Sequence, residues 1–106
     1  ILIKIKDMEI KVHSIHFDAD KELLTFIQER VDKLDNIFDR ILGSEVYLKV
    51  EKTSQPINKI AEIKLNLPGK EIFAKKQGKS FEEATDIAVD ALRRQLKRYK
   101  AGLNRV

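Results

Sequence analysis

Three consecutive segments in the middle of the chain alternate polar and apolar side chains, and helical patterns precede and follow them. The alternating segments are residues 45–53, 60–67 and 70–76. A period of two is typical of strands that bury one face, and Pro68-Gly69 between the last two predicts a tight turn. We therefore expect three successive strands, whose inward side chains are Val46, Leu48, Val50, Ala61, Ile63, Leu65, Leu67, Ile72 and Ala74.

A helix is predicted on each side of these strands. The first is capped by Asp18 or Asp20 and runs toward Leu42, where Gly43 is placed to end it in a left-handed conformation. Its apolar positions recur at helical spacing: Leu23, Ile27, Val31, Leu34, Phe38 and Ile41. The second follows a capping box of Ser80 and Glu83 and is expected to bury Ala84, Ala88, Leu92, Leu96, Tyr99 and Leu103.

A further alternating segment, residues 9–14, predicts a strand before the first helix. The order is then β-α-β-β-β-α. A helix between the first two strands favours a parallel crossover, and short connections make the remaining pairs antiparallel. We predict an α+β fold, a four-stranded mixed sheet with both helices packed on one face. The 106 residues suit a single domain, residues 8–106, preceded by an extension of residues 1–7 that is an added strand, a longer native start or a cloning remnant.

Positive charge is concentrated at the C-terminal end. The chain has 21 basic and 17 acidic residues, and residues 91–106 hold six of the basic ones and none of the acidic. The rest therefore has 15 basic against 17 acidic residues, so the excess lies on one terminal element. Localised charge of this kind indicates a polyanionic partner, most often a nucleic acid. The six are Arg93, Arg94, Lys97, Arg98, Lys100 and Arg105.

The helical phase of these residues places them away from the core. At about 100° per residue they lie roughly opposite the apolar positions of the last helix. Cations near a helix C-terminus also offset the macrodipole, and that explanation accounts for two or three of them. It does not account for six without an interspersed acid, because ordinary surface helices mix charges of both signs.

Two smaller basic clusters could extend this surface. In the first helix one flank carries Arg30, Lys33 and Arg40, and the other carries Asp32, Asp35 and Asp39. Lys75, Lys76 and Lys79 surround Gly78 before the last helix. If the basic flank of the first helix faces the last one, the clusters join into one broad surface. Such a surface can recognise the shape of a folded RNA through contacts with its phosphates. The candidate RNA-binding residues are Arg30, Lys33, Lys76, Lys79, Arg93, Arg94, Lys97, Arg98 and Lys100.

Other kinds of site have little support in the sequence. There is no cysteine, and His13 and His16 are expected on opposite faces, so we expect no metal and no cofactor. No acid, base and nucleophile come together, and an enzyme is the least favoured class. The absence of a signal-like or membrane-length apolar segment favours a cytoplasmic protein. Tyr47 and Phe73 are expected to face outward, and Gln95 is expected to make a local hydrogen bond.

Three stretches resemble a known family. They are Lys33-Leu34-Asp35 through Phe38-Asp39-Arg40-Ile41, then Tyr47-Leu48-Lys49-Val50-Glu51-Lys52, and most specifically residues 90–100, DALRRQLKRYK. Residues 8–103 resemble the short form of the bacterial ribosome hibernation promoting factors, also called ribosome-associated inhibitors, of the sigma-54 modulation protein family. Leu24, Glu82 and Ala91 depart from the arginine, tyrosine and lysine common there.

The resemblance implies a fold similar to a double-stranded-RNA-binding domain and a ribosome-binding role for residues 8–106. Members bind the small ribosomal subunit and its 16S rRNA, block the mRNA and tRNA decoding channel and silence translation in stationary phase or stress. Arg30, Lys33, Arg94, Arg98 and Lys100 match RNA-facing positions. The expected protein is a monomer away from the ribosome, with no membrane partner and no small-molecule substrate. The dimerisation domain of the long form is absent from the sequence, so pairing of ribosomes by that route is not expected.

Two other functions remain open at this point. One is a general double-stranded-RNA-binding module that is not specific to ribosomes. The other is a protein-interaction module that uses the open sheet face around Tyr47 and Phe73. Binding that depends steeply on salt favours an RNA partner over a protein partner.

Overall fold

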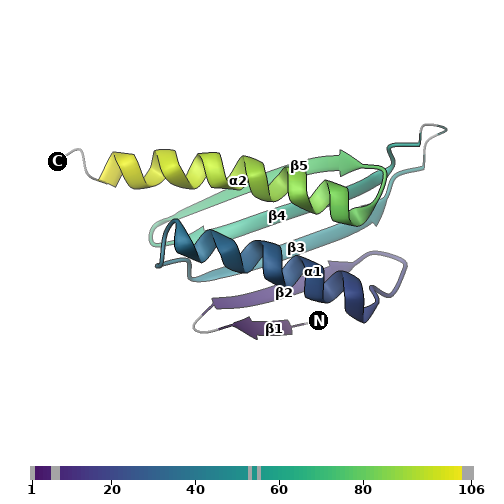
Figure 1. Ribbon diagram of the computed structural model, residues 1–106, viewed down its shortest axis with the longest axis horizontal. Coiled ribbons are helices and arrows are strands. Elements are labelled where there is room, and N and C mark those ends of the chain that lie inside the picture. The colour runs from purple at the N-terminus through teal and green to yellow at the C-terminus, as the bar shows by residue number, and fades with distance from the viewer. Residues whose placement is uncertain (1, 6–7, 53, 55, 104–106) are drawn as a thin grey trace.

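The computed structural model describes residues 2–5, 8–52, 54 and 56–103 and confirms the predicted order of helices and strands (Figure 1). The elements are β1 (Leu2–Ile5), β2 (Met8–Ser14), α1 (Lys21–Asp32), the 3-10 helix η1 (Lys33–Asn36), β3 (Gly43–Val50), β4 (Lys59–Leu67), β5 (Lys70–Gly78) and α2 (Phe81–Leu103).

The strands form one sheet in the order β1-β2-β3-β4-β5. Strands β2 and β3 are parallel, and the other neighbours are antiparallel. Strands β2 to β5 are thus the predicted four-stranded mixed sheet. The N-terminal extension contributes β1, which pairs with β2 from Leu2↔Lys11 to Ile5↔Met8 and adds a fifth strand at the edge. Gly69, with φ +74°, makes the predicted tight turn, since a Pro-Gly turn requires a positive φ at its glycine.

Both helices cover the same face of the sheet (Figure 1). Alternate strand residues and one stripe of each helix meet there, and removing these side chains from water is the main stabilising contribution. The fully buried positions include Ile10, Val46, Leu48, Ile63 and Leu65 from the sheet and Ile27, Val31, Ala84, Ala88, Leu92 and Leu96 from the helices.

The predicted N-terminal caps are confirmed for both helices. The Asp20 carboxylate accepts a hydrogen bond from the Leu23 amide at 2.8 Å, and the Ser80 hydroxyl accepts one from the Glu83 amide at 3.0 Å. The Glu83 carboxylate accepts in return from the Lys79 amide at 3.2 Å. These bonds satisfy amides that a helix start leaves without partners.

The predicted end of the first helix is wrong. Helix α1 ends at Asp32 and tightens into η1, and the amides of Ile37 and Phe38 both donate to the Leu34 carbonyl, at 3.0 and 3.3 Å. Phe38 and Ile41 are buried nonetheless, so their helical spacing reflects core contacts made from a turn. Asp35 and Asn36, which are weak helix formers, lie where the regular helix is lost.

Gly43 does not end a helix. It is the first residue of β3, opposite Glu9 of β2 and Asn66 of β4. The adjacent Leu42 donates its amide to the Asn66 carbonyl at 2.8 Å and exposes its side chain. The chain is therefore already extended where the sequence predicted the last helical turn.

Two residues predicted to be inward are exposed. Val50, the last residue of β3, is 48% exposed, and Leu103, the last described residue of α2, is 43% exposed. The last turn of α2 extends past the end of the sheet (Figure 1), so the helical spacing of apolar residues continues where Leu103 is only partly covered.

Alanine at Gly78 is expected to lower the free energy of unfolding by about 1–3 kcal/mol, because an added Cβ overpacks a close backbone contact. That Cβ would lie 2.8 Å from the Ala84 nitrogen and 3.1 Å from the Glu83 Cβ, both in the first turn of α2. Urea denaturation measures the change. The control is Gly102→Ala, where the space is open, so no loss is expected. Equal effects of the two substitutions would refute the close approach.

Candidate nucleic-acid interface

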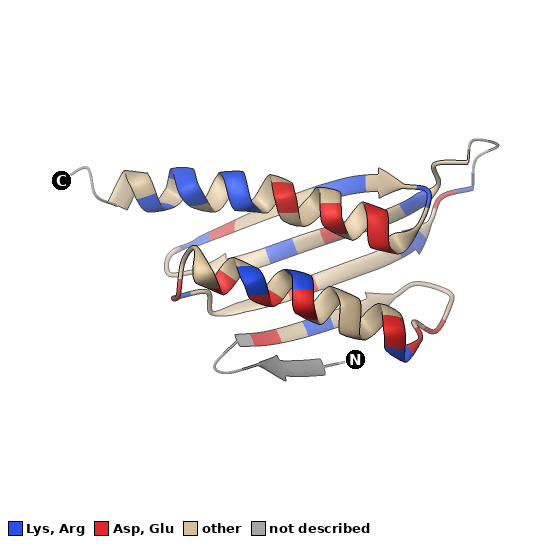
Figure 2. Ribbon diagram, in the orientation of Figure 1, with Lys and Arg blue, Asp and Glu red and all other residues tan. Residues whose placement is uncertain are grey.

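Helix α2 is acidic in its first half and basic in its second half (Figure 2). The first half carries Glu82, Glu83, Asp86 and Asp90. We define the basic face as the five exposed cations of the second half: Arg93, Arg94, Lys97, Arg98 and Lys100. They lie away from the buried Leu92 and Leu96, so the predicted phase is confirmed. Arg105 lies outside the described residues.

Ion pairs divide the basic face in two. Asp90 is 2.6 Å from Nη1 of Arg94 and 3.9 Å from Nη1 of Arg93. In the part of the chain that the structure describes, Lys97, Arg98 and Lys100 have no acidic partner. Exposed pairs contribute only about 0–1 kcal/mol, so a phosphate can replace Asp90. The unpaired charge is nevertheless greatest in the last two turns.

Arg30 faces α2, so it meets the condition under which the basic clusters of the two helices would join. Its partner on α2, however, is an acidic residue. Its Nε lies 2.7 Å from Oδ1 of Asp86, and its guanidinium lies 4.4 Å from the centroid of the Phe26 ring. Arg30 therefore links the two helices and is partly neutralised. Lys33 is exposed on η1, which packs against α2.

A groove between η1 and α2 carries part of the basic face. This interhelical groove is a cavity of about 400 Å³ lined by Asn36, Ile37, Lys97, Lys100 and Ala101. Two unpaired ammonium groups and an amide beside an apolar surface suit a sugar-phosphate strand laid along the helices.

The predicted separation of charge on the first helix is not observed. Asp35, Asp39 and Arg40 line one depression together with Lys100. Because α1 ends at Asp32, the residues that follow lack the helical phase on which the prediction rested.

The cluster around Gly78 is also divided. Strand register places Lys75 opposite Glu62 on the open face, whereas Lys76 lies opposite Ala61 on the helix-covered face. Lys76 and Lys79 lie near the start of α2, and at 1.5 Å per residue Lys97 is about 24 Å along the helix from Phe81. The structure therefore does not bring Lys76 and Lys79 together with the basic face.

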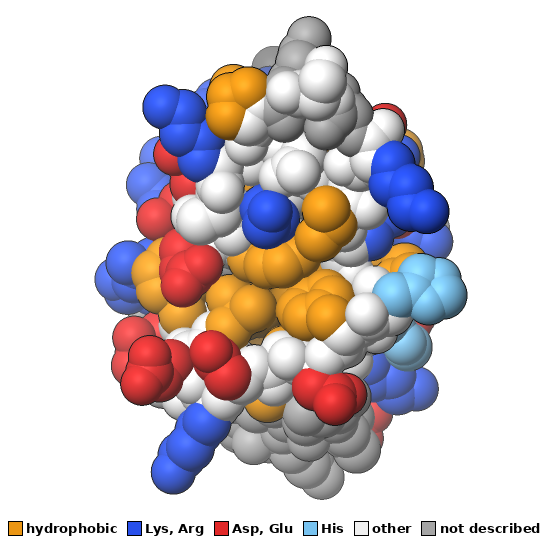
Figure 3. Space-filling view, turned by 90° about the vertical axis from the view of Figure 1, so that its right-hand side faces the viewer, with side chains coloured by type: hydrophobic (Ala, Val, Ile, Leu, Met, Phe, Trp, Pro, Cys, Tyr) orange, Lys and Arg blue, Asp and Glu red, His pale blue; other side chains and the backbone are white. Residues whose placement is uncertain are grey.

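The end of the molecule where α2 begins has a different chemistry. Figure 3 shows apolar side chains at its centre, with both acidic and basic side chains around them. The rings of Phe17 and Phe81 stack there, with centroids 4.9 Å apart, and Ile15 and Val50 are substantially exposed nearby. The apolar centre of this end offers no charged partner for a phosphate.

The open face of the sheet is charge-balanced. Alternation and register place four lysines and four glutamates of β2 to β5 on it, so their charges cancel: Glu9, Lys11, Glu45, Lys49, Glu62, Lys64, Glu71 and Lys75. Phe73 is 56% exposed there, and Tyr47 faces outward, as expected. A polyanion is therefore favoured on the helical side and not on this face.

Tyr47 organises a polar cluster on the open face. Its ring stacks on His13 with centroids 4.6 Å apart, and its hydroxyl donates to the Glu45 carboxylate at 2.9 Å. His13 Nε2 lies 3.2 Å from the same carboxylate. The hydrogen bond from Tyr47 is the largest cause that lowers the pKa of Glu45, and the same bond raises the pKa of the Tyr47 hydroxyl.

Replacing Tyr47 by phenylalanine is expected to raise the pKa of Glu45, because the donor that best stabilises its carboxylate is lost. In the wild-type protein this lowered pKa contributes stability above the ordinary pKa of about 4.5, and the contribution is lost as the pH falls through the lowered value. The variant should therefore be less stable than the wild type above that pH, and the difference should disappear in acid. A carboxyl-carbon NMR titration measures the pKa. Lys11→Gln, which removes the weakest cause, should shift it less. An unchanged pKa in Tyr47→Phe would contradict this assignment.

The described residues contain no group of three or more His, Cys, Asp or Glu side chains that could hold a metal ion. No helix among them has the length and apolar character needed to cross a bilayer.

Lys70 is a candidate residue that the sequence prediction did not include. With Arg98 it lines a second cavity of about 400 Å³, between β5 and the end of α2. The two residues are 28 positions apart on different elements, and no pattern in the sequence links them. Gln95 makes a hydrogen bond from Nε2 to the Phe73 carbonyl at 2.9 Å, but the partner lies on β5, 22 positions away, so the bond is not the local one expected.

Comparison with known sequences identifies relatives along most of the chain. The family model described as Sigma 54 modulation protein / S30EA ribosomal protein matches residues 10–104. The ribosome hibernation promoting factor of Pseudomonas putida is 30% identical over 93 residues, which are 88% of this chain and 87% of that protein. The protein of the same name from Klebsiella oxytoca is 32% identical, with 88% and 94% covered.

Solved structures share the fold. The crystal structure of the Thermus thermophilus Protein Y N-terminal domain matches with a TM-score of 0.74 and 25% identity, covering 84% of this chain and 94% of that one. A ribosomal subunit interface protein from Coxiella burnetii matches with a TM-score of 0.78 and 22% identity, covering 87% and 97%.

Proposed function

Because the chain belongs to the Sigma 54 modulation protein / S30EA ribosomal protein family, we propose that it is a ribosome hibernation factor that docks its helical side on the small ribosomal subunit. The relatives of 30–32% identity are ribosome hibernation promoting factors. The proposed result of docking is a blocked mRNA and tRNA decoding channel and an inhibited, protected ribosome in stationary phase or stress. The mechanism is steric occlusion, and it requires no catalysis.

The observation that carries the proposal is the unpaired charge of Lys97, Arg98 and Lys100. These cations project from the solvent side of α2, and the fully buried Leu96 on the opposite side orients this part of the helix. A rigid element that presents cations without acidic partners suits the phosphates of folded RNA. The neutral open face of the sheet offers no comparable surface.

We assign graded roles to the candidate residues. Lys97, Arg98 and Lys100 contact 16S rRNA phosphates directly, and Lys33 extends the contact from η1. Arg93, Arg94 and Arg30 contribute once a phosphate displaces Asp90 or Asp86. Lys76 and Lys79, at the other end of α2, make at most a separate contact.

Five phosphate contacts from the basic face predict a steep salt dependence for binding to isolated small subunits. The logarithm of the association constant should fall against the logarithm of the salt concentration with a slope of about −3.5 to −4.5. Fluorescence anisotropy of the labelled protein between 0.05 and 0.3 M salt, on the order of the physiological range, measures it. A slope near zero would overturn the electrostatic interface.

An arbitrary RNA duplex in the same assay separates the proposal from a general double-stranded-RNA-binding module. The proposal predicts much weaker binding to the duplex than to the small subunit, because the duplex offers only charge and A-form shape. Equal affinities for the two would favour the general module and contradict a ribosome-specific role.

A further inference from the structure

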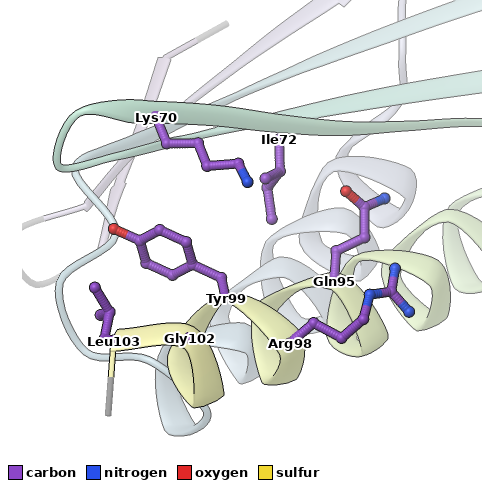
Figure 4. Close-up of a pocket in the computed structure, with 7 residues that line it drawn as sticks. All are labelled: Lys70, Ile72, Gln95, Arg98, Tyr99, Gly102 and Leu103. Carbon is purple, nitrogen blue, oxygen red and sulfur yellow. The ribbon is translucent and has the colours of Figure 1, made fainter. Parts of the chain in front are cut away.

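A cavity at the end of α2 combines features that the basic face alone does not have. It measures about 400 Å³ and lies between β5 and the last turns of α2. Lys70 and Ile72 reach it from the strand, and Gln95, Arg98 and Tyr99 from the helix (Figure 4). Its size lies within the range of about 300–1,000 Å³ that small-molecule sites occupy.

One wall of this cavity is a fixed aromatic ring. The Tyr99 hydroxyl donates to the Pro68 carbonyl at 3.2 Å, and the ring meets the Phe38 ring edge-on, with centroids 5.3 Å apart. Ile72 continues the wall with an apolar side chain. A flat ring held at both ends beside an aliphatic surface suits a planar heterocycle, which can pack there with little loss of side-chain entropy.

Two cations border the same space. Lys70 Nζ lies 5.8 Å from the centroid of the Tyr99 ring, and Arg98, which also lines the cavity, extends from the helix beside Gln95 (Figure 4). Within the described part of the chain neither cation has an acidic partner. An anion between them would gain charge-assisted hydrogen bonds from both.

Gln95 adds a directed acceptor. Its Nε2 is committed to the Phe73 carbonyl, at 2.9 Å. Its Oε1 lies on the side toward Lys70 and Ile72 (Figure 4), where it can accept a hydrogen bond from a ring N–H or exocyclic amine.

We propose that this cavity takes one unpaired nucleotide of an RNA strand, with its base against Tyr99 and Ile72 and its phosphate between Lys70 and Arg98. An anion, a planar ring and an N–H donor within one small volume are the chemistry of a nucleotide. Arg98 also belongs to the basic face. An RNA strand bound to the basic face can therefore place one unstacked nucleotide in the cavity. The inference rests on the proposed function and names a further contact for it.

Two probes distinguish a nucleotide within an RNA strand from a free nucleotide. The labelled full chain is titrated with UMP and with the single-stranded RNA pentamer of uridylate, and the side-chain amide of Gln95 and the ring of Tyr99 are followed by NMR. The pentamer should shift both sets of signals at a concentration at least about tenfold lower than UMP, since neighbouring phosphates add contacts. Saturation by UMP as tightly as by the pentamer would assign the cavity to free nucleotides and overturn the RNA assignment. Absence of shifts with both probes would overturn the site.

Small-subunit affinity gives the second test. Lys70→Met should weaken binding about fivefold to eightfold at 0.1 M salt, the loss expected for one phosphate contact. Tyr99→Leu, which keeps an apolar side chain, should weaken it about fivefold or more. The control Lys75→Met removes the same charge from the open face and should have no effect.

The outcomes separate the cavity from the docking surface. Unchanged affinity in both Lys70→Met and Tyr99→Leu, with small-subunit binding intact, would overturn the cavity alone. If the wild-type chain fails to bind small subunits, the proposed function fails, and the pentamer titration still decides whether the cavity takes a nucleotide.

Discussion

Reversing the charge of Lys97, Arg98 and Lys100 together, as glutamates, is expected to weaken binding to the small subunit at least about 100-fold at 0.1 M salt. Each phosphate contact makes the association constant at 0.1 M salt about fivefold to eightfold larger, relative to its value at 1 M salt. Three contacts together therefore raise the association constant about 100- to 500-fold. Reversal adds repulsion to this loss. The salt slope should also become shallower by about 2 to 3.

A matched control variant separates position from net charge. Lys49→Glu, Lys64→Glu and Lys75→Glu on the open sheet face also change the net charge from +4 to −2. This variant should keep most of the affinity, losing only the long-range attraction that salt screens. Similar losses in the two triple variants would show that binding follows net charge and not the basic face.

Truncating Leu92 to alanine is expected to lower the free energy of unfolding by about 2–5 kcal/mol. Leu92 is 0% exposed at the centre of the contact between α2 and the sheet, so the change removes apolar contacts and leaves a cavity. Domains of this size are stable by only about 5–15 kcal/mol. Urea or thermal unfolding followed by circular dichroism measures the change.

Leu103 provides the control on the same helix. It is 43% exposed where α2 extends past the sheet, and Leu103→Ala should change stability by less than about 0.5 kcal/mol. A large loss at Leu103, or a negligible one at Leu92, would show that α2 packs on the sheet differently from the arrangement described.

Local patterns were enough to predict the sheet and the beginnings of both helices. Strand alternation reports directly which side chains are buried, as at Ile63 and Leu65. Short-range hydrogen bonds define the caps at Asp20 and Ser80, and their residue types are visible in the sequence. These features depend on neighbours within four positions, so a single sequence suffices.

The misplaced boundaries have a common physical cause. Phe38 and Ile41 are buried although they follow the end of α1, and Leu103 keeps the period of α2 although the sheet has ended. Periodicity records which residues are apolar, but not whether a regular helix presents them or a partner surface covers them. Tertiary packing decides both.

The candidate site was predictable only in part. The phase of the basic face followed from the helix alone. The pairing of Arg30 with Asp86, 56 positions away, and the meeting of Lys70 with Arg98 depend on how α1 and β5 pack against α2. The pairs of Asp90 with Arg93 and Arg94 have the i, i+3 and i, i+4 spacing of a helix, so they are visible in the sequence.

Docking of the helical side should exclude mRNA and tRNA from the small subunit. Equilibrium binding of labelled tRNA to mRNA-programmed small subunits, at increasing concentrations of the protein, tests this exclusion. Bound tRNA should fall to zero as the protein saturates, and the apparent dissociation constant of the protein should rise linearly with the tRNA concentration. A stable complex that holds the small subunit, tRNA and this protein together at full occupancy would contradict it.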